Sequence, residues 1–259
     1  MNARHREIGA ADLIRVFMRG LLVQASWSFE RMQSLGFAYA IEPVLRKLYP
    51  DPEEYESRLR LHMTYFNTQP YLASYILGAV MRLEQERASG RNRAADVQGL
   101  KTSLMAPLGA LGDSVFWGSL KPFAAVMAVA LVITGSGWAP LLFLTIYNSV
   151  HVVLRAGVLV SGYRSGGDAV DLVARYRFTR MAKLLKVTSL VMLGVIPGML
   201  PSWRPEFRFA VTAPDMAVSA AGLALTLGIV GLLRKGGSPV TFMLGLGVAC
   251  LVMAYAGVI

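Results

Sequence analysis

An amide-rich segment among aromatic residues is the first place in this sequence where residue types suggest chemistry. The segment reads Tyr65-Phe66-Asn67-Thr68-Gln69-Pro70-Tyr71. Side-chain amides both donate and accept hydrogen bonds, which suits the hydroxyl groups of a sugar, and the aromatic rings offer faces on which a sugar ring can stack. The structural alternative is a helix end, where Pro70 stops the helix and the amides satisfy free backbone groups.

A second group of such residues lies earlier in the chain. Gln24, Trp27 and Arg31 recur at helical spacing and share one helix face, and Glu30 lies beside Trp27. A carboxylate next to a tryptophan is again compatible with sugar binding. The alternative is an interfacial tryptophan with a surface ion pair.

The stretch from Leu104 to Pro122 combines features of a membrane helix and of a loop. It is apolar at both ends, but Gly109, Gly112 and Asp113 interrupt it. A broken or re-entrant segment at 104–121 explains both features, because irregular backbone at membrane depth is tolerated where it is buried in protein or lines a cavity. An acidic residue there is a functional candidate. The alternative is a loop that leads into the first span, with Asp113 as a helix N-cap.

Composition points to a protein that crosses a membrane several times. Hydrophobic residues make up 54% of the 259 residues, and the mean hydropathy is +0.48, outside the usual range of soluble domains. The charged residues are unevenly spread, with 14 Lys/Arg and 11 Asp/Glu in residues 1–103 against 12 and 5 in residues 104–259. The net charge of +10 does not indicate nucleic acid, since the basic residues cluster beside apolar spans.

The sequence predicts no catalytic residue, no metal site and no cofactor. Cys250 is the only cysteine, so neither a disulfide within the chain nor a thiolate metal site can form. His5, His62 and His151 are the only histidines, and none has a carboxylate at ligand spacing. We interpret His62 as a helix-surface residue whose replacement by alanine is nearly silent.

Helical periodicity dominates residues 1–103, which we interpret as an amphipathic region on the cytoplasmic side. One helix begins near Asp12, which is a plausible N-cap. A second runs from about Glu53 to Phe66, and a third from Tyr71 to Arg87. Their apolar faces are expected to lie on the membrane or on partner helices.

Residues 104–259 are predicted to be embedded in the membrane. A spanning helix needs about 20 mostly apolar residues, and the candidates lie near 122–137, 138–162, 188–200, 216–233 and 240–259. In the second candidate, Asn148, His151 and Arg155 share one face. We interpret them as a structural polar seam that reaches toward Asp113, the alternative being that Arg155 snorkels to the cytoplasmic end. The predicted fold is an all-α polytopic membrane protein of about five spans.

Several of these stretches together resemble one family. They are Gln24-Ala25-Ser26-Trp27-Ser28-Phe29-Glu30-Arg31-Met32-Gln33, Leu35-Gly36-Phe37, Phe66-Asn67-Thr68-Gln69-Pro70, Leu104-Met105-Ala106-Pro107-Leu108 and Gly112-Asp113-Ser114-Val115-Phe116-Trp117. In this order and at this distance they are similar to the IID component of the mannose/fructose/sorbose-type bacterial phosphotransferase system. The similarity runs from about Asp12 to the C-terminus.

The resemblance implies a subunit of the bacterial cytoplasmic membrane that works with other proteins. It pairs with a IIC subunit, in an assembly that is expected to be trimeric, to move a hexose across the bilayer. Cytoplasmic IIA and IIB proteins carry the phosphoryl group, and IID itself holds no phosphorylated histidine. The chain would therefore be a transport subunit without enzymatic activity of its own.

Two other functions remain open at this point. A chain descended from such a transporter could act as a membrane scaffold or regulator, or it could serve as a docking protein for a phage or bacteriocin. On the transport interpretation, Asn67 and Gln69 act with Glu30 near the junction with IIC. Gln24, Trp27 and Asp113 complete the predicted substrate-binding set.

Charge asymmetry predicts the orientation of the spans. The basic residues between Arg164 and Lys186, and the pair Arg234-Lys235, should lie on the cytoplasmic side. The N-terminus is then inside and the C-terminus outside. A reporter fused at Arg175 should be found in the cytoplasm, and its detection on the outer side would contradict the five-span topology.

Overall fold

The fold is that of a computed structural model, which describes residues 7–91, 96–166 and 177–203 and isolated residues between 228 and 255. The chain divides into two compact units, Met1–Arg204 and Pro205–Ile259, and the elements named here lie in the first. They are α1 (Ala10–Gly20), α2 (Ser34–Leu48), α3 (Pro52–His62), α4 (Ala73–Ala88), α5 (Val97–Gly112), a π-helix (Asp113–Leu120), α6 (Lys121–Ile133), α7 (Ala139–Ser165) and α9 (Phe178–Trp203). The described residues form no strand beyond isolated backbone bridges.

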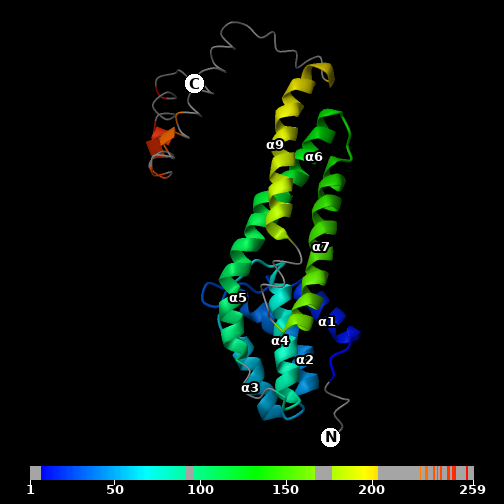
Figure 1. Cartoon of the computed structure of the whole chain (residues 1–259), viewed down its shortest axis with the longest axis vertical. Coiled ribbons are helices and arrows are strands. Elements are labelled where there is room, and N and C mark those ends of the chain that lie inside the picture. Colours follow the sequence, from blue (N-terminus) through cyan, green and yellow to red (C-terminus); the bar gives the residue numbers. More distant parts are fainter. Residues whose placement is uncertain are drawn as a thin grey trace. The chain divides into compact units, whose positions relative to one another are not determined.

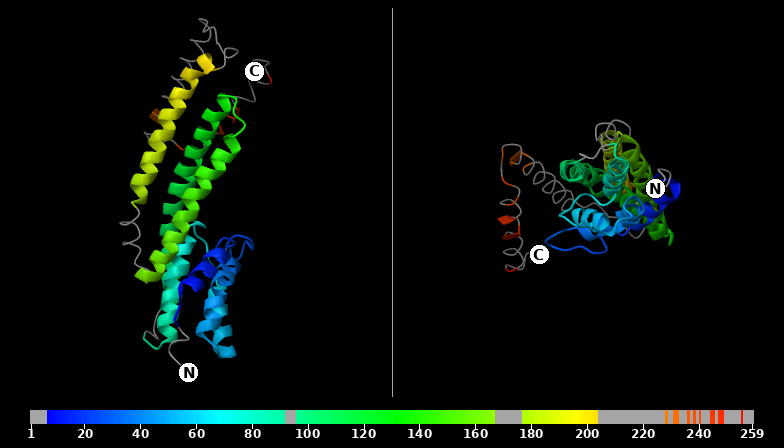
Figure 2. Two further views of the ribbon diagram at one scale, coloured as in Figure 1. Left: turned by 90° about the vertical axis from the view of Figure 1, so that its right-hand side faces the viewer. Right: turned by 90° about the horizontal axis from the view of Figure 1, so that it is seen from below.

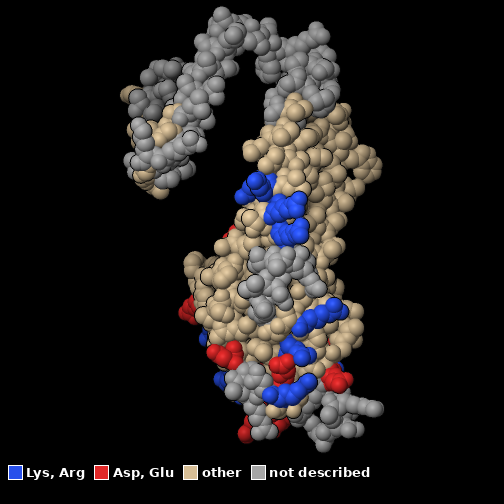
Figure 3. All heavy atoms as spheres, viewed as in Figure 1, with Lys and Arg blue, Asp and Glu red and all other residues tan. Residues whose placement is uncertain are grey.

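The helices of the first unit form two regions. Helices α1 to α4 gather at one end, and α6, α7 and α9 run side by side away from it (Figures 1 and 2). On the face in view in Figure 3, the end of the molecule formed by α6 and the far part of α7 carries no charged side chains, whereas both signs occur around α2 to α4. The division at residue 103 into a cytoplasmic and a membrane-embedded region stays a prediction.

Short polar side chains fix where several helices begin. The Asp51 carboxylate accepts the amide of Glu54 at 2.9 Å and starts α3, with Pro52 in the first helical position. The Asp96 carboxylate does the same for Gly99 at 2.7 Å and starts α5. The predicted cap at Asp12 is displaced by one turn, because α1 begins after Gly9 and Asp12 instead accepts the Gly9 amide at 3.0 Å. Such contacts satisfy amides that have no partner within the helix.

The stretch predicted to be broken or re-entrant is a helix that does not reverse. Residues Val97–Ile133 form one helical run, in which regular α geometry gives way to the π-helix Asp113–Leu120. The Ser119 hydroxyl donates to the carbonyl of Ser114, five residues earlier, at 2.6 Å. A π-turn absorbs an extra residue within a helix and is common at functional sites, so the glycines and Asp113 modify the helix without ending it.

Two helical runs are long and apolar enough to cross a membrane, namely Val97–Ile133 and Ala139–Ser165. They contain the predicted span 122–137 up to Ile133 and the predicted span 138–162 from Ala139 onward. The predicted span 188–200 lies within α9, which begins ten residues earlier, at Phe178. The predicted spans 216–233 and 240–259 lie outside the residues that the structure describes, apart from isolated positions, so the count of five stays a prediction.

Helix α4 is the centre of the first unit. Its residues from Ala73 to Met81 are all buried, and it packs against α1, α2, α5 and α7. The approach to α7 is close because glycines face backbone on both sides. A Cβ atom added at Gly78 would lie 2.1 Å from the carbonyl oxygen of Leu159, and one added at Gly162 would lie 2.1 Å from that of Tyr75.

Alanine at either contact glycine should therefore destabilise the protein. Gly78→Ala and Gly162→Ala force the two helices apart, a strain that typically costs about 1–3 kcal/mol and opposes a gain in helix propensity of up to about 1 kcal/mol. Thermal unfolding of the purified chain in detergent should show lower midpoints for both variants. Gly137→Ala is the control, since a Cβ there has no neighbour within 4 Å. Unchanged midpoints in the α4–α7 variants would contradict this packing.

Candidate functional site

The amide-rich segment is held in place by a pair of hydrogen bonds from Gln33. The Gln33 side chain donates to the carbonyl of Thr68 at 2.8 Å and accepts the Thr68 amide at 3.2 Å. The Gln33 backbone amide also donates to the carbonyl of Phe66 at 2.8 Å. On the other side, the Thr68 hydroxyl donates to the carbonyl of Met105 in α5 at 2.9 Å. The segment is thus fixed between the start of α2 and α5.

Gln69 has both a structural role and a free polar atom. Its side-chain oxygen accepts the amides of Tyr71 at 2.8 Å and Leu72 at 3.1 Å, just before α4 begins. This is the helix-end role expected from the alternative interpretation. Its side-chain nitrogen is buried and has no hydrogen-bond partner among the described residues. Gly112 in α5 makes room for this side chain, since a Cβ there would lie 2.6 Å from the Gln69 Cβ.

A groove of about 730 Å³ opens along this segment and the facing side of α5 and the π-helix. Four of the predicted site residues line it, together with two half-exposed aromatic side chains. These are Gln24, Asn67, Gln69 and Asp113, with Tyr65 and Trp117. Asn67 is exposed, and its side-chain amide makes no hydrogen bond to the described residues. The groove therefore offers amides, a carboxylate and aromatic faces, a set suited to recognising hydroxyl groups.

Glu30 and Trp27 are not brought to the groove. Both are exposed and lie in the irregular segment between α1 and α2. Trp27 is 49% exposed and contacts the edge of Phe29, with ring centroids 5.4 Å apart. The helical spacing that grouped them with Gln24 does not apply, because the chain between Leu21 and Gln33 forms turns instead of a helix.

Arg155 is buried within the helical bundle, as the interpretation of a structural seam required. Its guanidinium donates to the Ser74 hydroxyl at 3.1 Å and to the carbonyl of Gly20, the last residue of α1. The neighbouring His151 stacks on Tyr71 at 4.4 Å between ring centroids and hydrogen-bonds to Asn148 at 2.9 Å. The seam thus joins α7 to α1 and α4, and the described contacts of these side chains do not include Asp113.

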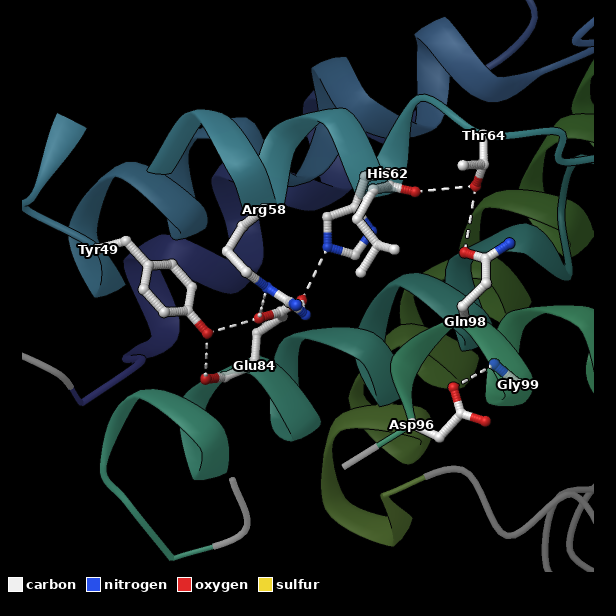
Figure 4. A network of polar contacts seen from close by, with 9 residues as sticks. Tyr49, Arg58, His62, Thr64, Glu84, Asp96, Gln98 and Gly99 are labelled. Atoms are coloured by element: carbon white, nitrogen blue, oxygen red, sulfur yellow. Dashed lines mark hydrogen bonds and ion pairs between the residues drawn. The ribbon is translucent and has the colours of Figure 1, made fainter. Parts of the chain in front are cut away.

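A buried carboxylate network joins α4 to α3 and to the residue that follows α2 (Figure 4). Glu84 is fully buried and accepts hydrogen bonds from the Tyr49 hydroxyl at 2.6 Å, from Arg58 and from His62 at 2.9 Å. Helices α3 and α4 and the residue that caps the end of α2 therefore meet at one carboxylate. Sequence reasoning missed this network because its members lie 22 to 35 residues apart and share no motif.

The structure corrects the interpretation of His62 as a surface residue. Its side chain is wholly buried at the end of α3, between Glu84 and the ring of Phe37. Lys101 of α5 is also fully buried, and its ammonium lies 4.8 Å from the Phe37 ring centroid. Replacing His62 with alanine would remove a hydrogen bond from a buried carboxylate and is not expected to be silent.

Burial and hydrogen bonding oppose each other at this network. Burial alone raises the pKa of Glu84, but the hydrogen bonds from His62 and Arg58 outweigh it and lower the pKa to about 2. Burial lowers the pKa of His62 below its usual value, against the opposing attraction of Glu84. Lys101 and Arg58 lower it further by repulsion. Glu84 is therefore charged and His62 neutral at pH 7.

These features define a helical membrane protein with a polar groove, and comparisons identify its family. Residues 7–259 match the family model described as the PTS system mannose/fructose/sorbose family IID component. The chain belongs to this family.

Among the described residues, no group of three or more His, Cys, Asp or Glu side chains is arranged to hold a metal ion.

Relatives and solved structures agree with this assignment. The chain is 36% identical over 200 residues to the mannose-specific EIID component of Escherichia coli K12, which covers 76% of this chain and 70% of that protein. It is 26% identical over 275 residues to the fructose permease IID component of Bacillus subtilis, covering 98% of both. A chain in the structure of the mannose transporter ManYZ with microcin E492 is 30% identical with a TM-score of 0.59, over 97% of this chain and 98% of that one. A second solved structure, that of a membrane protein, gives a TM-score of 0.73 at the same identity and coverage.

The Glu84 network should make stability depend on pH. The folded-state pKa values of Glu84 and His62 both lie below their unfolded values. The stability that these two groups contribute is therefore fully present above about pH 6.5. As the pH falls, the unfolded chain binds protons first at His62 and then at Glu84 more readily than the folded chain does, so this contribution decreases. Acidification below pH 6.5, and further from about pH 4.5 toward pH 2, should lower the free energy of unfolding, measured by urea titration in detergent.

Glu84→Gln should remove the lower part of this pH dependence. At pH 7 it should also cost about 3–5 kcal/mol, because Arg58 remains buried without its counter-charge. Glu56→Gln is the matched control, since its ion pair with Arg60 in α3 is exposed and such pairs contribute little. Equal stability of the two variants would refute a structural role for Glu84.

Proposed function

We propose that this chain pairs with a IIC membrane subunit to form the unit that translocates a hexose across the bacterial cytoplasmic membrane. Cytoplasmic IIA and IIB proteins carry the phosphoryl group to the incoming sugar, and this chain has no enzymatic activity of its own. Its membership of the IID family supports the pairing. The assembly is proposed to be trimeric, with the N-terminus and residues 1–103 on the cytoplasmic side and residues 104–259 in the bilayer.

The observation that carries this proposal is the polar groove beside the π-helix. Asn67 presents to it a side-chain amide that makes no hydrogen bond to the described residues, and Gln69 a buried side-chain nitrogen without a partner among them. Asp113 supplies a carboxylate, and Trp117 an aromatic face. A buried donor without a partner costs roughly 1–3 kcal/mol, and a ligand hydroxyl would remove that cost. We assign these residues and Gln24 to the sugar path.

Glu30 and Trp27 have a different standing in this proposal. They were predicted as part of the same substrate-binding set, but they do not line the groove. Any contribution from them would require the IIC subunit or a further conformation to bring substrate to their loop. For this chain alone, we assign the contacts with sugar to the groove residues.

Uptake and phosphorylation of a panel of hexoses by cells with the complete set of subunits tests the function. Removing this chain should abolish both. Phosphorylated IIB incubated with this chain and labelled sugar, in the absence of IIC, should yield no sugar phosphate. Transport that persists without the chain would favour the alternative of a scaffold or regulator. Sugar phosphate formed without IIC would reveal an active site in this chain.

Asn67→Ala should weaken uptake strongly. Losing one hydrogen-bond partner costs roughly 1–3 kcal/mol, which corresponds to about one to two powers of ten in apparent affinity. Asp113→Asn tests the carboxylate in the same way. Measurements of initial uptake against sugar concentration, at matched membrane levels, would give the change.

A control variant and a copurification measurement separate binding from folding in this experiment. Glu56→Gln alters a surface carboxylate of α3 and should transport at nearly normal affinity. Both Asn67→Ala and Glu56→Gln should copurify with IIC. Glu30→Gln, predicted from the sequence to weaken uptake strongly, tests in the same complex whether IIC brings substrate to the loop outside the groove. Normal affinity in Asn67→Ala would return the amide-rich segment to a purely structural role.

A further inference from the structure

Helix α1 exposes an apolar stripe that no described element covers. Its buried side is marked by Asp12, Val16 and Gly20, which face the rest of the unit. The exposed stripe lies at positions separated by four, seven and eight residues, which share one helix face. Its members are Ile14 (64% exposed), Met18 (55%), Leu21 (38%) and Leu22 (51%), the last two in the turn that follows the helix.

The stripe is followed by two exposed aromatic side chains in the next loop. Trp27 is 49% exposed and Phe29 86% exposed, and they contact each other edge to face. Aromatic side chains gather at the boundary between bilayer and water, because the ring is apolar and the indole N–H is polar. An exposed pair of this kind in a free aqueous surface would leave much apolar area in contact with water.

Basic side chains lie beside the apolar stripe. A groove of about 520 Å³ between α1 and α2 is lined by Arg15, Arg19, Arg46 and Lys47, and Glu42 is the one carboxylate among its described lining residues. Arg19 and Arg46 pair with Glu42. Lys47 pairs with Asp12 outside the lining, and Arg15 forms no hydrogen bond or ion pair with the described residues. The groove keeps an excess of positive charge that suits an anionic phosphate group.

The position of α1 along the molecule matches the edge of a bilayer. The carbonyl of Gly20 accepts a hydrogen bond from Arg155, and α1 lies beside the lower part of α7 (Figures 1 and 2). Arg155 stands 16 residues after Ala139, the first residue of α7, or about 24 Å along the helix. The hydrocarbon core is about 30 Å thick, so α1 ends close to the level at which a span beginning at Ala139 leaves it.

We propose that α1 and the loop through Phe29 lie in the interface of the cytoplasmic leaflet, with the phosphates of anionic phospholipids in the α1–α2 groove. The apolar stripe enters the boundary between headgroups and acyl chains, and the arginines contact the headgroups. A partner protein would have to match an apolar stripe and a basic groove together. The anionic leaflet next to the spans supplies both complements. This inference does not depend on the assignment of the sugar path.

Lipid contact can be measured on the full chain in nanodiscs. Cys250→Ser provides a cysteine-free background, and Met18→Cys carries an environment-sensitive fluorophore. In nanodiscs of phosphatidylcholine and phosphatidylglycerol, the label should emit at shorter wavelength and be quenched by doxyl-labelled lipid. The same label at Glu56→Cys, on the exposed side of α3, should be quenched little.

Anionic selectivity is the second readout. Doxyl-labelled phosphatidylglycerol should quench the Met18 label more strongly than doxyl-labelled phosphatidylcholine at equal content. Arg15→Gln with Arg46→Gln should reduce this preference, by roughly fivefold for each basic residue removed. Arg60→Gln, in the exposed pair of α3, is the matched control and should leave the preference unchanged.

Three results would overturn the proposal. One is a label at position 18 that stays polar and unquenched in every nanodisc. Another is equal quenching by both lipids. The third is protection of the label that appears only after the IIC subunit is added, which would make the face a protein interface instead.

Discussion

The close contact between α4 and α7 is the constraint on which the rest of the first unit depends. Gly78 and Gly162 let backbone meet backbone, so α4 can be buried while it still contacts α1, α2 and α5. The Gln69 side chain accepts hydrogen bonds from the amides of Tyr71 and Leu72, just before α4 begins, and so lies beside the long helical run Val97–Ile133. Gly112 then allows that run to approach Gln69, and the groove forms where the two meet.

The polar side chains around this core separate into those that hold the fold and those left available. The side-chain amide of Gln33 both donates to and accepts from the backbone of Thr68. The Glu84 carboxylate accepts hydrogen bonds from Tyr49, Arg58 and His62. Buried groups of this kind must be satisfied, since an unpaired one is costly. Asn67 and Asp113, by contrast, are exposed along the groove. This difference is the physical basis for assigning recognition to the second set.

The surface outside the groove follows a comparable division. The far part of α7 is apolar without interruption by charge, as expected of a helix in lipid, whereas Arg155 is buried and shared between α1 and α4. Helix α1 combines an apolar stripe with basic neighbours. The described surface therefore divides into an uncharged part on α7 and a part on α1 where apolar and basic side chains adjoin.

The sequence by itself determined the family, the all-helical class and the local signals. The caps at Asp51 and Asp96 depend only on residues three positions away. Asn67 and Gln69 are close together because they belong to one short segment. Tertiary structure decided which distant groups meet. Glu84 contacts His62, which lies 22 residues earlier in the chain. Glu30 and Trp27 lie outside the groove because their segment folds into turns. The periodicity of a sequence indicates which residues share one helix face, but it does not show which faces of different helices pack together. It also does not predict the π-helix that keeps the glycine-rich stretch continuous.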